Sequence, residues 1–110
     1  MNTKTKGNLA EDKACKYLID KGFKILNRNF YFKGGEIDII AFKNHVIHFI
    51  EVKSGSGFEP IFNITPAKIT RIIKGANIYM QKNRLNKAFC IDAIIIKETS
   101  IEHLENLTLK

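Results

Sequence analysis

The fold is decided by residues 35–53, which read GEIDIIAFKNHVIHFIEVK. Two runs rich in β-branched and aromatic residues, 36–42 and 46–53, flank a polar break at Lys43 and Asn44. This pattern predicts two strands joined by a tight turn. Alternate residues of a strand share a face. The faces of interest are Glu36, Asp38, Ile40 and Phe42 on the first strand, and Ile47, Phe49, Glu51 and Lys53 on the second.

The charged residues of these strands indicate chemistry. A carboxylate inside an apolar strand is costly unless a cation or hydrogen bonds compensate it. If the strands pair, Asp38 and Glu51 converge at the rim of the sheet, where two carboxylates suit a hard divalent ion, most simply Mg²⁺, with Mn²⁺ as the substitute. A plainer interpretation also stands, in which Glu51 and Lys53 form an ordinary ion pair at a strand end.

The N-terminal side completes an antiparallel meander. Residues 23–32 form another strand pattern, joined to the next by a turn at Gly34 and Gly35. Before it, a buried stripe of Ala10, Ala14, Tyr17 and Leu18 predicts a helix over residues 9–21. We expect Gly7 or Asn8 to cap this helix, Glu11 and Asp12 to occupy its first turn, and Gly22 to end it.

The C-terminal half predicts a crossover. Residues 54–63 have a loop composition, and Thr65 with Pro66 begins a helix that buries Ile69, Ile72, Ile73, Ala76 and Met80. The apolar run 89–97 indicates a strand covered on both faces and parallel to its neighbour. Residues 101–109 are expected to form an edge strand. The fold class is therefore α/β, with residues 1–110 as a single domain in which a mixed β-sheet is flanked by helices in the order αβββαβ.

Charge favours a polyanionic partner. The chain carries 18 Lys and Arg against 11 Asp and Glu, a net charge of +7. No acid lies between Glu59 and Asp92, whereas six basic residues do: Lys68, Arg71, Lys74, Lys82, Arg84 and Lys87. Lys68, Arg71 and Lys74 share one side of the second helix. They either hold nucleic-acid phosphates or form a solvated face.

Other residue types give weaker signals. Cys15 and Cys90 are too far apart in sequence to suggest a zinc knuckle or a redox pair. His45, His48 and His103 lack the spacing of a histidine metal site, so structural roles are expected. Residues 30–32, an aromatic run, suit core packing better than base stacking. The start of the sequence lacks a signal-peptide pattern and no apolar run is long enough to span a bilayer, so a cytoplasmic protein without a membrane partner is expected.

Two motifs together resemble a known family. GEIDIIA at 35–41 followed by FIEVK at 49–53 is similar to the signature of the YraN-like family, bacterial proteins similar to archaeal Holliday-junction resolvases of the PD-(D/E)xK nuclease superfamily. GNLAE at 7–11 and KITR at 68–71 also resemble that family. The resemblance implies a restriction-endonuclease-like core, metal binding by Asp38, Glu51 and the Val52 carbonyl, and a catalytic role for Lys53. Glu11 occupies the place of the resolvases' helix-one acid.

Two departures qualify what the resemblance implies. Ile37 stands where the superfamily's name has proline, and the serine that resolvases carry has no counterpart at Arg28, Asn29 and Phe30. The function expected is a metal-dependent endonuclease acting on DNA, at branched or distorted structures, and the resolvase likeness makes a homodimer reasonable. The alternatives are a nucleic-acid-binding module that retains the nuclease fold without turnover, and a basic domain that binds an acidic protein.

Overall fold

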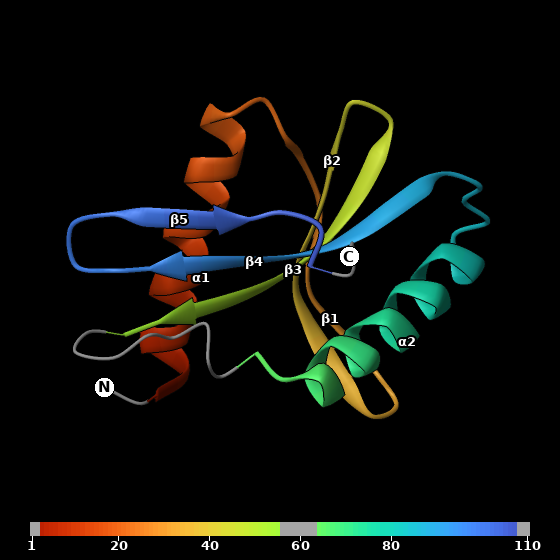
Figure 1. Cartoon of the computed structure of the whole chain (residues 1–110), viewed down its shortest axis with the longest axis horizontal. Coiled ribbons are helices and arrows are strands. Elements are labelled where there is room, and N and C mark those ends of the chain that lie inside the picture. The colour runs from red at the N-terminus through yellow and green to blue at the C-terminus, as the bar shows by residue number, and fades with distance from the viewer. Residues whose placement is uncertain (1–2, 56–63, 108–110) are drawn as a thin grey trace.

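The protein is one mixed sheet with a helix on each face (Figure 1). The computed structural model describes residues 3–55 and 64–107, with side chains from Leu9 onward. The chain runs through α1 (Thr3–Asp20), β1 (Lys24–Phe32), β2 (Gly35–Lys43), β3 (Val46–Ser54), α2 (Pro66–Lys82), β4 (Ala88–Ile96) and β5 (Ile101–Leu104). The strands lie side by side in their sequence order. The predicted α/β class is confirmed.

The first three strands form the expected antiparallel meander. Its turns fall one residue away from the predicted positions. Gly34, at φ 113°, takes the left-handed conformation between β1 and β2. Asn44 and His45, at φ 51° and 66°, form the turn between β2 and β3. Two consecutive positive φ angles match the twist of an antiparallel hairpin, which explains why so short a connection suffices.

The predicted crossover is also confirmed. β4 runs parallel to β3, in register from Val46 against Ala88 to Ser54 against Ile96. Between them, α2 begins at Pro66, and the Thr65 hydroxyl accepts a hydrogen bond from the Lys68 amide at 3.2 Å. Most of the predicted loop 54–63 lies outside the described residues. This connection places the first turns of α2 over the ends of β2 and β3.

The start of the first helix was predicted wrongly. α1 begins at Thr3, so Gly7 and Asn8 lie inside the helix and no acidic residue occupies its first turn. Glycine costs a helix only about 1 kcal/mol, too little to fix where it starts. The predicted end is confirmed, because Gly22 adopts φ 93° and the Phe23 amide bonds the Leu18 carbonyl at 2.9 Å.

Two cores cover the faces of the sheet. On the α2 face, Ile40, Ile47 and Phe49 pack with Ile72 and Tyr79. On the α1 face, Ala14, Leu18, Phe23, Ile50 and Ile94 form a second cluster. The predicted edge strand exists but is shorter than expected, because β5 ends at Leu104 and the Leu107 amide then bonds the Ile91 carbonyl at 2.7 Å. Phe30 is buried as expected, while Tyr31 is 68% exposed.

Candidate active site

The pairing of β2 with β3 ends where the predicted site begins. The ladder runs from Lys43 against Val46 to Ile39 against Ile50, and the next residues on the two strands, Asp38 and Glu51, are not part of it. Asp38 Oδ2 instead accepts a hydrogen bond from the Val52 amide at 2.8 Å. The Asp38 side chain thus takes the place of the backbone carbonyl that strand pairing would offer to the Val52 amide. This hydrogen bond holds the Asp38 carboxyl beside Glu51.

A hollow of about 180 Å³ opens at this junction. Four of the residues that line it come from the two strands, and the others from the first turns of α2; they are Glu36, Asp38, Glu51, Lys53, Lys68, Arg71 and Ile72. The face shared by Asp38, Glu51 and Lys53 is therefore as predicted. Lys74 is not among the lining residues: its Nζ lies near Gly34, at the turn between β1 and β2.

Asp38 has an unusual protonation equilibrium. Its partial burial, the negative charge of Glu51, a hydrogen bond shared with Glu51 and the charge of Glu11 all raise the pKa of Asp38, to about 8. The Val52 amide opposes this rise but does not cancel it. Because the two carboxylates repel each other, the pair is best compensated by a cation from outside. The donor set therefore fits a hard divalent ion.

Glu11 joins these acids from α1. Asn29 in β1 departs from the extended conformation, at φ 53°. Its Nδ2 donates to Glu11 Oε1 at 3.0 Å and to Glu36 Oε2 at 2.8 Å. Arg28 pairs with Asp12 at 2.9 Å and approaches Glu11 at 3.6 Å. Glu11 was expected in the first turn of the helix, but it lies near the middle of α1, and its side chain is only 12% exposed. Asn29 thus links Glu11 to Glu36.

Lys53 has room to act on a ligand. Its Nζ lies 3.8 Å from Glu51 Oε1, too far for a strong hydrogen bond, and both side chains are partly exposed. The ion pair of the plainer interpretation is therefore present, but loose. Since Lys53 and Glu51 line the same hollow as Asp38, the pair belongs to the acidic site.

A second polar group, which the sequence did not predict, lies on the α1 face. Asp92 in β4 is fully buried, and its Oδ2 is 2.6 Å from His48 Nδ1 and 2.8 Å from His103 Nε2. Asp92 Oδ1 accepts from the Asn106 amide at 2.9 Å and the Cys90 thiol at 3.3 Å. His48 and His103, for which the sequence indicated only structural roles, meet at this one carboxylate. Together with Glu105 they form a group that could hold a metal ion.

The electrostatics of Asp92 are the reverse of those of Asp38. Burial alone would raise the pKa of Asp92, but hydrogen bonds from His103, His48 and the Asn106 amide together hold it well below its usual range. The one signal in the sequence was Asp92 itself, a single acid inside the apolar run 89–97, because a buried carboxylate requires donors. Cys15 and Cys90 are both unpaired thiols, as expected.

The comparisons with known proteins place the chain in a family. The profile of the "Uncharacterised protein family UPF0102" matches residues 10–96, and the chain belongs to this family. It is 53% identical to a UPF0102 protein of Helicobacter hepaticus over 109 residues, which cover 99% of each chain. It is 50% identical to one of Wolinella succinogenes over 107 residues, covering 97% of this chain and 99% of the relative. The family match includes Glu11, Asp38, Glu51 and Lys53.

Membrane insertion through a helix has no support in the described part of the chain. Neither α1 nor α2 is long and apolar enough to cross a bilayer.

Proposed function

We propose that this protein is a metal-dependent endonuclease of the PD-(D/E)xK class that hydrolyses DNA phosphodiester bonds inside the cell. The observation that carries the proposal is the pairing of Asp38 with Glu51 beside Lys53, in a hollow whose other wall is Lys68 and Arg71. A cluster of carboxylates with cations on its rim fits a phosphate group held by a divalent ion. A module that only bound DNA would gain nothing from acids that face a polyanion.

Each residue of the hollow has a proposed role. Asp38, Glu51 and the Val52 carbonyl would hold Mg²⁺ or Mn²⁺, which when bound polarises a phosphodiester oxygen and activates a water. The ammonium of Lys53 would stabilise the negative charge that develops on the phosphoryl oxygens and orient the attacking water. Glu11, through Asn29 and Glu36, would fix the outer edge of the acidic group. Lys68 and Arg71 would hold phosphates of the same strand, with Lys74 further along it.

The substrate is expected to be branched or distorted DNA. This expectation rests on the resemblance of the two strand motifs to those of proteins similar to Holliday-junction resolvases. Symmetric cleavage of a branched DNA needs two such sites, which a homodimer would supply.

The test is cleavage of a DNA panel by the purified chain. Linear, nicked, flapped and four-way DNAs are incubated with Mg²⁺, with Mn²⁺ or with EDTA. We expect cleavage only with a divalent ion, and its loss by about 10²- to 10³-fold or more in Asp38→Asn, Glu51→Gln and Lys53→Ala. Glu102→Gln, which changes an exposed acid of β5, serves as the matched control and should keep wild-type activity.

Three outcomes would contradict the proposal. Cleavage by Asp38→Asn within a few-fold of wild type would remove the site. DNA binding that survives EDTA without cleavage of any substrate would favour the non-catalytic binding module. No affinity for any DNA would favour a basic domain that meets an acidic protein.

A further inference from the structure

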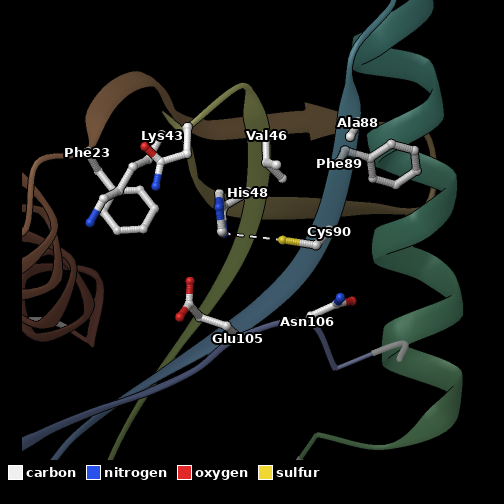
Figure 2. A pocket seen from close by; sticks show the side chains of 10 residues that line it. Phe23, Lys43, Val46, His48, Ala88, Phe89, Cys90, Glu105 and Asn106 are labelled. Atoms are coloured by element: carbon white, nitrogen blue, oxygen red, sulfur yellow. Dashed lines mark hydrogen bonds between the residues drawn. The ribbon is translucent and has the colours of Figure 1, made fainter. Parts of the chain in front are cut away.

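A second hollow lies on the other side of the sheet from the acidic site. It measures about 560 Å³, and His48, Cys90 and Glu105 border it from β3, β4 and the segment after β5 (Figure 2). His48 and Cys90 also contact the fully buried Asp92. The hollow therefore leads from solvent to the buried histidine and aspartate group.

We propose that His48, Asp92, His103 and Glu105 bind a transition-metal ion of the Zn²⁺ type, at a site separate from the acidic hollow. Each residue offers one ligand atom, and these atoms lie within 4.8 Å of one another. Two imidazole nitrogens with carboxylate oxygens suit Zn²⁺ and its neighbours in the first transition row. The all-oxygen set of Asp38 and Glu51 suits Mg²⁺ instead.

The ligands are arranged before any ion arrives. Asp92 Oδ1 is held by the Asn106 amide and the Cys90 thiol, which leaves Oδ2 directed at His48 Nδ1 and His103 Nε2. Outer partners of this kind fix the orientation of a ligating carboxylate. Binding would put the ion in place of the hydrogen that each imidazole directs at Asp92 Oδ2. A neutral imidazole would then carry its one proton on the other ring nitrogen, and only an imidazolium would release a proton to solvent.

A covalent role for Cys90 does not fit the same geometry. Burial, reinforced by the charge of Asp92, raises the pKa of the Cys90 thiol to about 12, so the thiolate that attacks an electrophile is scarce. The thiol and the carboxylate also approach the same His48 nitrogen, at 3.2 and 2.6 Å. A histidine that relays a proton uses its two nitrogens for two different partners. The cluster is therefore suited to binding an ion rather than to nucleophilic attack.

The site connects the short edge strand β5 with the centre of the sheet. β5 is a four-residue edge strand, and His103 lies in it. His48 belongs to β3 and Asp92 to β4, and Glu105 follows β5 at an exposed position next to the hollow. An ion bound by all four would fasten the edge strand to the centre of the sheet, and it would stabilise the native state because the unfolded chain lacks the site.

The experiment uses the full chain carrying Asp38→Asn and Glu51→Gln, so that the acidic hollow cannot contribute. After removal of metals with EDTA, the protein is titrated with Zn²⁺ by calorimetry and with Co²⁺ by visible absorption. We expect one equivalent of either ion, an absorption spectrum of nitrogen-ligated Co²⁺, and a rise in melting temperature with Zn²⁺. Absence of stoichiometric binding would overturn the proposal.

Single variants locate the site. Glu105→Gln alters an exposed ligand without touching the buried network and should weaken Zn²⁺ binding by about tenfold or more. His103→Gln should abolish it. His45→Gln, which changes an exposed histidine in the turn after β2, is the matched control and should bind like its parent. If His103→Gln does not fold, Glu105→Gln decides the question, and an affinity equal to that of its parent would contradict the assignment.

Discussion

Asp38 and Asp92 both lie in the same sheet, yet Asp92 is surrounded by hydrogen-bond donors and Asp38 by other acids. Asp92, fully buried, receives donors at both oxygens: two histidines, a thiol and a backbone amide. Asp38 receives the Val52 amide and is otherwise close to the acids Glu51 and Glu11. The hydrogen-bond donors that Asp92 needs thus come from the chain itself. The negative charge around Asp38, in contrast, must be neutralised by a cation from outside the chain. The comparison indicates that Asp92 supports the fold even in the metal-free chain, because its donors come from the chain itself, whereas Asp38 depends on a cation from outside.

The largest expected effect is the loss of stability in Asp92→Asn. The substitution removes the charge on which His48, His103 and the Asn106 amide converge, and breaking a buried charged network costs about 3 to 5 kcal/mol. Urea denaturation should show this decrease in the free energy of unfolding. Glu105→Gln, at an exposed position nearby, should change it by less than about 0.5 kcal/mol. An Asp92→Asn protein as stable as wild type would show that the network does not support the fold.

Gly75→Ala perturbs the α2 face of the sheet, where the acidic hollow lies, and leaves the histidine group on the α1 face untouched. Gly75 on α2 faces the ring of Phe32 in β1 so closely that an added Cβ would collide with it. Gly75→Ala gains about 1 kcal/mol in helix propensity but overpacks this contact, so a net loss of about 1 to 2 kcal/mol is expected in urea denaturation. Because α2 carries Lys68 and Arg71, divalent-ion cleavage should fall while Zn²⁺ binding at His48 stays unchanged. A parallel loss of both would mean that the two sites are not independent.

Charge reversal at Lys68 and Arg71 tests the rim of the acidic hollow. If both contact phosphates, the Lys68→Glu and Arg71→Glu double variant should lower DNA affinity about tenfold or more and reduce the slope of log affinity against log salt by about 2. Fluorescence anisotropy at several salt concentrations measures both quantities. Lys82→Glu with Arg84→Glu makes the same change in net charge at exposed positions beyond the hollow and should preserve the slope. Equal slopes in the two double variants would assign Lys68 and Arg71 to solubility alone.

The acidic site could be predicted because its parts are local in sequence. Asp38 and Glu51 lie on consecutive strands joined by a tight turn. The alternation of side chains along each strand, together with the place of that turn, is enough to bring them to the same face and the same end of the strand pair. Alternation and capping residues likewise predicted the meander and α2. The start of α1 was not predicted, because Gly7 and Asn8 have low helix propensities and are typical of a helix cap. These propensities are too weak to stop the helix from beginning at Thr3.

The histidine group could not be predicted because its parts are distant. His48 and Asp92 are 44 residues apart, and they meet only through the parallel register of β3 with β4. His103 reaches the same oxygen from β5. Sequence patterns indicate which residues form each strand, but they do not give the register between strands connected by a helix. Asn29 was missed for a similar reason, since it has a positive φ within a strand and bonds Glu11, which lies 18 residues earlier in α1.

The smallest expected effect is also the sharpest test of the comparison, because it requires no substrate. Asp38→Asn keeps an oxygen for the Val52 amide but removes the repulsion with Glu51 and Glu11. In EDTA the variant should therefore be as stable as wild type, or more stable by up to about 1 kcal/mol. Mg²⁺ or Mn²⁺ should raise the melting temperature of wild type, since the ion binds only the native state, and this rise should vanish in the variant.

The pH dependence of the melting temperature tests whether the charge of Asp38 destabilises the metal-free protein. The folded-state pKa of Asp38, about 8, lies above the value of an unfolded aspartate, so its contribution to stability is present below pH 4 and is lost as pH rises toward 8. Glu51, Glu11 and Glu36 face it with negative charge, and Lys53, Lys68 and Arg71 with positive charge. In EDTA, the stability advantage of Asp38→Asn over wild type should therefore grow between pH 5 and pH 8. A variant that melts clearly below wild type in EDTA, with an undiminished response to the ion, would make Asp38 a structural acid like Asp92.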